Sequence, residues 1–446
     1  MPISTEISDD AAPTGVTPRS VSRQQHEHTA AAGRSIASNP DFRCFWTAEA
    51  ISQVGSQFTE VALPLLAALS LGATPVAVGA LAAATGLPHL LFGLLAGAWL
   101  DRLRRKPVMI AADLGRAALL LVIPVAAWLG VLGMPLLIVV AFLLQTLTLF
   151  FDIAYLSYLP SLVPRSDLVA ANSRLEATAS SARVVGPALA GGVVRLVGAP
   201  LAIVVDAASY LGSAVFLWRI EAPEAPPTPS RQSMRADIAQ GLQAVWTAPV
   251  LRALALSSAI VNLAGFLFLS IYILYMTRDL GLGAEAVGLV FAAGGVGALL
   301  GSIAAGPARD RFGIGTALVG SQILFGLTGM LVPLAVLFPR WAVLLVVGAE
   351  FLQWLMVLVY DVNAVSLRQA VTPDHLLGRV NGTMRFLIWG TRPLGSLAGG
   401  YLGSRIGLPM TLVVGAFGML IAFLPLLASP IPKLRSLNDV SVMGTA

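Results

Sequence analysis

The chain has 446 residues, of which 11% are charged, whereas an ordinary soluble domain carries about 25%. Apolar residues make up 57% of the sequence, and the mean hydropathy is +0.81. A soluble protein of this size could not keep so much apolar surface from water, so the composition excludes a soluble enzyme. It excludes a disordered chain for the same reason. The remaining class is a polytopic membrane protein.

Long uncharged segments predict the membrane-spanning elements. A spanning helix needs about 20 mostly apolar residues, and segments of this length are too long for transmembrane strands. When these segments are divided at Gly, Pro and clustered charges, they predict an all-α protein with twelve helices. In chain order the helices are 44–69, 76–100, 107–130, 135–160, 173–197, 200–219, 250–275, 285–308, 314–337, 341–368, 381–405 and 409–430.

The two ends of the chain are polar and differ in character from this core. Residues 1–39 have no apolar signal-peptide core, so we expect a disordered tail there and a second tail at 431–446. An even number of helices places both tails on one side. Most basic residues fall on that side, including the run Arg102–Lys106. This bias predicts cytoplasmic termini in an inner or plasma membrane, so the net charge of +5 is a topology signal and not a nucleic-acid footprint.

A polar segment divides the chain into two parts. Residues 221–248 contain the Pro-rich stretch EAPEAPPTPS and then an amphipathic run, Ser233–Trp246. This pattern predicts a cytoplasmic linker with an interfacial helix. The expected domains on either side are two six-helix bundles, 40–220 and 249–430.

The second bundle repeats the first at an offset of 209 residues. Asp152 matches Asp361, and Arg183 matches Arg392. Coincidences of charged residues within membrane segments are improbable by chance, because such residues are rare there. Further identities include Gly97, Asp101 and Arg102 with Gly306, Asp310 and Arg311, and Gly191 with Gly400. Secondary transporters use two parallel repeats of this kind.

A sequence signature lies between the second and third predicted helices. The segment Gly97–Lys106 resembles the G-x-x-x-D-R-x-x-R-[RK] loop signature of the major facilitator superfamily, and Gly306–Gly313 resembles its second copy. Within that superfamily the chain resembles enterobactin exporters and macrolide-efflux proteins, through segments 159–164, 168–172 and 203–209. The resemblance implies two pseudo-symmetric six-helix bundles. It also implies export of an amphipathic drug, antibiotic or siderophore by proton antiport with alternating access.

The same resemblance implies a gate on the inward side. Asp101 is expected to cap the helix predicted at 381–405, and Arg105 is expected to pair with Asp152. A carboxylate at a helix N-terminus and an interhelical ion pair would hold that side shut until the bundles rock apart. In the second copy Ile314 occupies the place of Arg105. The alternative is that these charges only fix topology. The candidate gating residues are Gly97, Asp101, Arg102, Arg105, Asp152, Asp310, Arg311 and Asp361.

The fifth predicted helix carries a cluster of small residues. Its segment with Arg183, Gly186, Pro187 and Gly191 resembles the antiporter motif G-P-x-x-G-G, with one extra residue. Small residues let helices approach closely, and Gly-Pro bends a helix. Ordinary close packing is the alternative interpretation.

Three carboxylates within predicted spans have no copy in the other half. Glu60, Asp206 and Glu350 correspond to Leu269, Gly415 and Ala141. An ionisable group inside the membrane costs a few kcal/mol, about 2.5–3.5 at the helix centre, and a carboxyl group removed from water binds a proton more readily. We therefore expect proton coupling at one of these residues.

Polar and aromatic residues on the predicted cavity helices suit an amphipathic substrate. The candidates are Gln57, Gln145, Asn262, Gln353, Trp354 and Arg392. The single cysteine, Cys44, excludes a thiolate metal cluster, and no metal or cofactor is expected. No enzyme motif is present, so we do not expect an enzyme. We expect a monomer that binds protons, lipid and a small-molecule substrate. A nutrient importer or facilitator and a non-transporting sensor remain open.

Overall fold

The computed structural model describes residues 38–100, 103–164, 167–224, 234–373 and 376–436, and this part of the chain is helical without strands. The first-half helices are α2 (Pro40–Leu65), continued by a π-helix η1 (Leu66–Ser70), α3 (Pro75–Leu100), α4 (Arg105–Trp128), α5 (Met134–Leu162), α6 (Leu168–Val197) and α7 (Ala199–Trp218). After α8 (Met234–Thr247) come α9 (Pro249–Arg278), α10 (Ala284–Phe312), α11 (Ile314–Leu334), α12 (Ala342–Val371), α13 (Leu377–Ile406), α14 (Leu408–Ile421) and α15 (Leu424–Leu427). Three short 3-10 turns complete the set, η3 (Ala335–Leu337), η4 (Pro339–Trp341) and η6 (Ile431–Lys433).

The first helix begins four residues before its predicted start, because its first turn is polar and capped. The Asn39 side-chain oxygen accepts hydrogen bonds from the backbone N–H groups of Asp41 (3.0 Å) and Phe42 (3.1 Å). Pro40 occupies the first helical position, where its missing N–H costs nothing. Hydropathy alone does not detect a start of this kind.

The last predicted helix, 409–430, corresponds to a segment that is long and apolar enough to cross the membrane, Leu408–Leu427, but the helix is interrupted. The structure has α14 followed by a turn at residues 422–423 and the short helix α15. Pro425 lacks a backbone N–H, so it cannot donate the hydrogen bond that would join the two helices.

Nine helical segments of the described residues are long and apolar enough to cross a membrane, so the protein is a multi-pass membrane protein. Three further long helices, α2, α6 and α13, have 26, 30 and 30 residues but fall outside this group. They carry many of the ionisable residues, among them Glu49 and Glu60 on α2 and Arg392 on α13. Twelve spans therefore stay the prediction, with α2, α6 and α13 among them.

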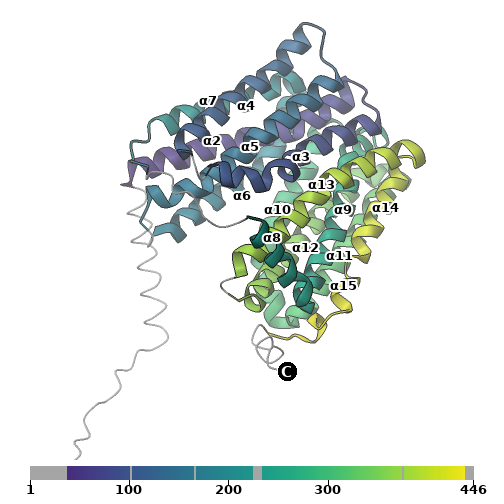
Figure 1. Cartoon of the computed structure of the whole chain (residues 1–446). Helices are drawn as coiled ribbons and strands as arrows, with labels where there is room; N and C mark the ends of the chain where they lie inside the picture. The colour runs from purple at the N-terminus through teal and green to yellow at the C-terminus, as the bar shows by residue number, and fades with distance from the viewer. Residues whose placement is uncertain (1–37, 101–102, 165–166, 225–233, 374–375, 437–446) are drawn as a thin grey trace, which may run out of the picture.

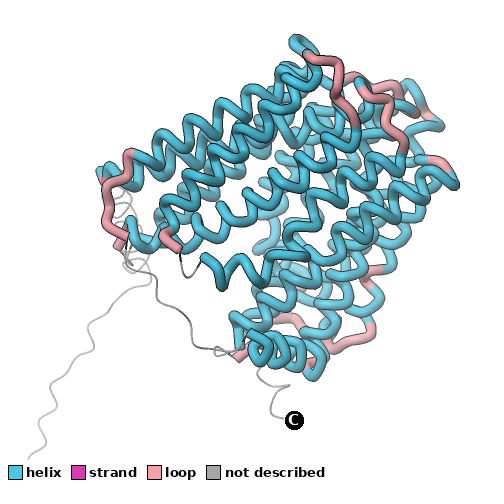
Figure 2. Tube along the Cα trace, turned by 45° about the horizontal axis from the view of Figure 1, so that its top comes forward, coloured by secondary structure: helices cyan, strands magenta, loops and turns pink. Residues whose placement is uncertain are grey.

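The helices form two bundles, shown in Figure 1 in purple to teal for α2–α7 and in teal-green to yellow for α9–α15. Helix α8 packs against α9 and α13 of the second bundle. We call the ends of the helices near Pro40 and Pro249 the terminal face, and the ends near Ser70 and Arg278 the distal face. The bundles touch along α3 with α13 and along α6 with α10. In Figure 2 the tubes of the two bundles diverge from this contact.

A buried ion pair lies in the core of the first bundle. Asp113 and Arg116 on α4 are 0% and 3% exposed and pair with each other. The Arg116 guanidinium also lies 4.2 Å from the ring centroids of Phe151 and Tyr210. This charge-bearing core has no equivalent in the second bundle, where the residues 209 positions later are Gln322 and Phe325.

Removing one partner of this pair should be strongly destabilising. We expect Arg116→Phe to lower the free energy of unfolding by about 3–5 kcal/mol, because Asp113 is left buried and uncompensated. The double variant Asp113→Gln with Arg116→Phe copies the second bundle and should recover most of that loss. Thermal unfolding of detergent-solubilised protein measures both. Equal melting temperatures for the single variant and the wild type would contradict this role of the pair.

Candidate functional site

The two bundles meet at the distal face through pairs of glycines. Gly191 on α6 faces Gly288 on α10, and Gly79 on α3 faces Gly400 on α13. A Cβ atom added at Gly191 would lie only 2.6 Å from the Ala284 carbonyl oxygen and 3.0 Å from the Gly288 Cα. The two contacts are copies of each other at the 209-residue offset. The repeat therefore builds a two-fold helix contact in which backbones touch.

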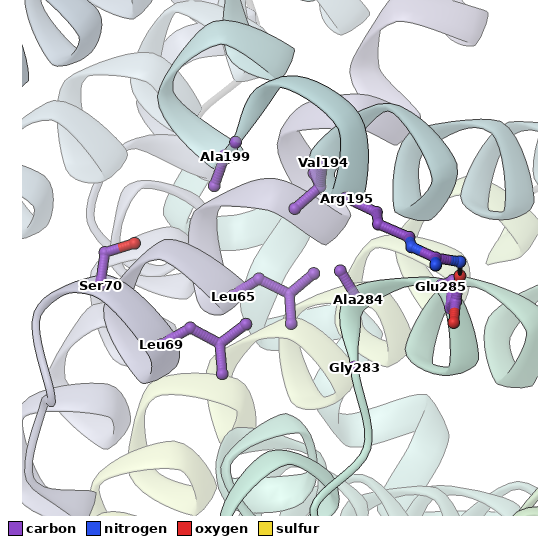
Figure 3. A pocket seen from close by; sticks show the side chains of 10 residues that line it. Leu65, Leu69, Ser70, Val194, Arg195, Ala199, Gly283, Ala284 and Glu285 are labelled. Carbon is purple, nitrogen blue, oxygen red and sulfur yellow. Dashed lines mark hydrogen bonds and ion pairs between the residues drawn. The ribbon is translucent and has the colours of Figure 1, made fainter.

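Polar contacts reinforce this distal contact. Arg195 at the end of α6 forms an ion pair with Glu285 at the start of α10. The Arg278 guanidinium donates a 2.7 Å hydrogen bond to the carbonyl of Ala73 in the other bundle. A pocket of about 360 Å³ lies beside the Arg195–Glu285 pair, with Leu65 and other residues on its wall (Figure 3). These contacts hold the bundles together at the distal face.

A central charge cluster, Glu60, Arg183 and Arg392, lies further along the helices. Arg392 and Arg183 are the cations that act on the Glu60 carboxylate. The Gln57 amide donates a 3.2 Å hydrogen bond to Glu60, and both residues lie on α2. Glu60 is exposed, and Arg392 comes from the opposite bundle. A charge interaction across the two bundles depends on their relative position, which is the property that a coupling site requires.

Contacts with both bundles fix the position of Arg392. Its guanidinium donates a 3.1 Å hydrogen bond to the Thr85 hydroxyl on α3, and it lies 5.2 Å from the Phe266 ring centroid. Nearby, the rings of His89 and Trp389 stack across the bundle boundary with centroids 4.4 Å apart. The repeat mate Arg183 instead forms a 2.5 Å ion pair with Glu176 on its own helix. The two repeated arginines therefore share Glu60 and differ in their other partners.

The helix-five motif lies on α6 and takes part in this bundle boundary. Gly186 leaves room for the Gln57 side chain, which holds Glu60. The Pro187 carbonyl oxygen lies against Gly288 on α10. The motif thus packs both against the cluster helix α2 and against the opposite bundle.

The expected pair between Arg105 and Asp152 is not formed in this structure, which corrects that prediction. Glu224, which follows α7, is the acidic partner of Arg105 in place of Asp152. Its carboxylate accepts hydrogen bonds from the backbone N–H groups of Arg105 (2.5 Å) and Lys106 (3.3 Å), and the Arg105 guanidinium lies 3.5 Å from it. A carboxylate is stabilised at a helix N-terminus, so Glu224 is held at the start of α4. The cations that act on Asp152 are Arg116 and Arg385.

The other candidate gating residues lie apart from one another. Asp101 and Arg102 are outside the described residues, and Gly97 lies within α3. Asp310 is exposed and pairs with its neighbour Arg309, and Arg311 lies over the ring of Phe312. Asp361 lines a cavity in the second bundle. Whether these residues form a gate stays a prediction.

That cavity has a volume of about 270 Å³ and is lined by residues of the second bundle. It brings together three predicted substrate residues and two predicted carboxylates: Asn262, Gln353, Trp354, Glu350 and Asp361. The Trp354 indole N–H donates a 2.9 Å hydrogen bond to Glu350, which is 5% exposed. The other three predicted substrate residues do not line this cavity. Arg392 belongs to the central charge cluster, Gln57 donates a hydrogen bond to it, and Gln145 is half-buried on α5.

Asp206 lies away from this cavity, sealed between α7 and α2. It is 0% exposed and accepts hydrogen bonds from the Thr59 hydroxyl and, at 3.1 Å, from the Ser209 hydroxyl. Its neighbour Gly55 leaves no room for a side chain. Asp206 on α7 therefore holds α7 against α2 within one bundle. Its partner Thr59 is the residue before Glu60 on α2.

Sequence reasoning missed several residues that build these sites. Gly79 and Gly288, and likewise Gly86 and Gly295, are pairs at the 209-residue offset that lie at the bundle boundary. That offset was the available signal, although glycine identities carry little weight in so glycine-rich a chain. Glu224 has no repeat mate that would mark it.

Comparisons with known proteins agree with this architecture. The sequence profile described as transmembrane secretion effector matches residues 34–444. The multidrug efflux pump Tap of Mycolicibacterium fortuitum is 28% identical over 397 residues, which cover 87% of this chain and 94% of the pump. An uncharacterised MFS-type transporter of Sinorhizobium fredii is 30% identical over 284 residues, or 62% of this chain and 70% of that protein.

Solved structures share the fold. A bacterial homologue of the iron transporter ferroportin in its inward-facing state superposes with a TM-score of 0.73 at 16% identity, covering 87% of this chain and 98% of that one. The nucleoside transporter NupG gives a TM-score of 0.64 at 13% identity, covering 87% and 98%. The predicted fold of two helix bundles of the major facilitator type is confirmed.

Proposed function

The protein belongs to the transmembrane secretion effector family of MFS transporters and is a membrane transporter of small molecules. We propose that it exports an amphipathic compound by proton antiport. The observation that carries this proposal is the central charge cluster. An acid on one bundle, Glu60, interacts electrostatically with a basic residue on the other, Arg392, and the distal face is held closed.

The contacts between the bundles support an alternating-access cycle. The glycine pairs and the Arg195–Glu285 ion pair lie toward the distal face, whereas the tubes diverge from that contact in Figure 2. We place the terminal face in the cytoplasm, as the distribution of basic residues predicts. In this conformation the protein would then receive substrate from the cytoplasm, and rocking of the bundles would release it on the other side.

Among the three candidate carboxylates, Glu60 is the best placed for proton coupling. It is exposed, and one of its cations, Arg392, belongs to the opposite bundle. When the bundles move apart at the distal face, Glu60 would lose that cation and bind a proton more readily. When they return, Arg392 would favour release of the proton. Asp206 is sealed within one bundle, and Glu350 lies in the second-bundle cavity.

Transport into inside-out vesicles tests the proposal. Vesicles with an acidic interior should accumulate a fluorescent amphipathic dye, and the accumulation should vanish when an ionophore collapses the pH gradient. Macrolides and siderophores extend the panel. Accumulation that persists unchanged after collapse would contradict proton antiport.

The same vesicles distinguish export from the alternative functions, import and sensing. The name of the pump Tap, an efflux pump, favours export. A nutrient importer would instead empty preloaded inside-out vesicles, and a sensor would bind its ligand without moving it. Chemical crosslinking in native membranes tests the expected monomer.

A further inference from the structure

The cavity of the second bundle has an unusual combination of charge and lining. Two carboxylates, Glu350 and Asp361, line it, and none of the described residues that line it is basic. Six aromatic side chains surround the same space: Phe266, Phe268, Tyr272, Phe325, Trp354 and Tyr360.

Glu350 differs from the other buried acids of the described chain in its surroundings. The Arg116 guanidinium acts on three other buried acids of the first bundle, Asp113, Asp206 and Glu49. Glu350 forms no ion pair among the described residues, and its near polar groups are the neutral side chains of Trp354 and Tyr272. A buried carboxylate without a cation is costly, unless it binds a proton or a cation arrives from outside.

A second observation points to a ligand in this cavity. The amide nitrogen of Gln353 is buried at the cavity wall and has no hydrogen-bond partner among the described residues. The residue is 7% exposed. Buried polar groups are normally satisfied, so an orphan donor beside a cavity indicates an acceptor atom on a bound molecule.

The cavity chemistry is specific to the second bundle. Across the 209-residue offset, Glu350 corresponds to Ala141, Trp354 to Gln145 and Gln353 to Leu144. Gly294 on α10 makes room for the pair, because a Cβ there would lie 2.7 Å from the Trp354 ring and 3.1 Å from the Glu350 side chain. Residues that hold the acid in place therefore come from two helices and are absent from the repeat.

We propose that the second-bundle cavity, with Glu350 as its anchor, binds aromatic organic cations that also carry a hydrogen-bond acceptor. This inference names the substrate class and rests on the proposed transport function. The carboxylate would pair with the cationic centre, and the aromatic rings would stack on the planar part and attract its charge. The Gln353 amide would donate to the acceptor. The volume of about 270 Å³ lies near the lower end for ligand pockets, so the ligand is compact.

Equilibrium binding to purified protein in detergent tests this site without any gradient. The probes are 10-methylacridinium, a planar cation, and acridine, which is neutral at about pH 8 and has nearly the same shape. The ring nitrogen of acridine can also accept a hydrogen bond from the Gln353 amide, and that of 10-methylacridinium cannot, so a preference for the cation is a lower limit on the effect of its charge. The wild type should bind the cation at least about ten-fold more tightly, and Glu350→Gln should abolish this preference while acridine binding stays unchanged. Glu350→Asp should retain the preference, and Trp354→Leu should weaken binding of both probes.

The matched control is Glu221→Gln, which removes a carboxylate outside the helices and should leave both affinities unchanged. Equal affinities of the wild type for the two probes would overturn the proposal, as would a preference that survives in Glu350→Gln. Vesicle transport separates this result from the proposed function. Cation-selective binding without gradient-driven uptake would overturn proton antiport and leave the site standing. Gradient-driven uptake without cation-selective binding would overturn the cation site and leave proton antiport standing.

Discussion

Replacing Gly191 with alanine should reduce transport at least about ten-fold. The added methyl group would meet the backbone of α10, with contacts of 2.6 Å to the Ala284 oxygen and 3.0 Å to the Gly288 Cα. Backbone atoms cannot rotate away, so the helices must separate at the distal face. Overpacking of this kind costs about 1–3 kcal/mol, and 1.4 kcal/mol is a factor of ten in an equilibrium. Initial rates of dye uptake into inside-out vesicles measure the loss.

The adjacent residue provides the control. A Cβ at Gly192 would meet nothing within 4 Å, so Gly192→Ala should transport like the wild type, although it makes the same change in helix propensity. The repeat predicts that Gly400→Ala behaves like Gly191→Ala. Opening of the distal face is read from labelling of Leu65→Cys by an impermeant maleimide, after Cys44→Ser removes the native thiol. Normal transport and unchanged labelling in Gly191→Ala would show that this contact does not limit the cycle.

Neutralising Glu60 should separate substrate movement from pumping. Glu60→Gln keeps the size of the side chain but cannot lose a proton, so we expect exchange of substrate down its gradient with an accumulation ratio near one. Wild-type vesicles under the same pH gradient should accumulate substrate several-fold. Glu60→Asp retains the acid and should retain pumping.

A variant of the partner residue Arg392 tests the same prediction. Arg392→Gln leaves Glu60 without a cation from the opposite bundle and should also abolish accumulation. If the two residues act together, the double variant should be no worse than either single variant, because effects of interacting residues are not additive. Wild-type accumulation in Glu60→Gln would remove this residue from the coupling mechanism.

Much of the fold follows from apolar segment length and from the repeat. Both are properties of one-dimensional sequence, since a span needs a minimum number of apolar residues and a duplicated bundle retains its charged positions. Two of the differences from the predicted helices depend on local hydrogen bonding. The first helix starts at an Asn39 cap, and the last is broken near Pro425, and neither feature changes the hydropathy.

The site was less predictable because it depends on which faces of the helices meet. Sequence analysis singled out Glu60, Asp206 and Glu350 together, since each lacks a repeat mate. Only tertiary packing separates them, by placing Glu60 near Arg392, Asp206 against Thr59 and Glu350 beside Trp354. The interaction of Arg105 with Glu224 also depends on the path of the chain after α7, which no motif encodes.

Proton movement driven by substrate tests proton antiport most directly. Purified protein is reconstituted into liposomes that contain a pH-sensitive dye, with no pH gradient and with a substrate gradient imposed across the membrane. Antiport requires that substrate flowing out draws protons in, so the interior should acidify with the wild type and stay neutral with Glu60→Gln. Substrate flow through the wild type that leaves the internal pH unchanged would contradict the mechanism.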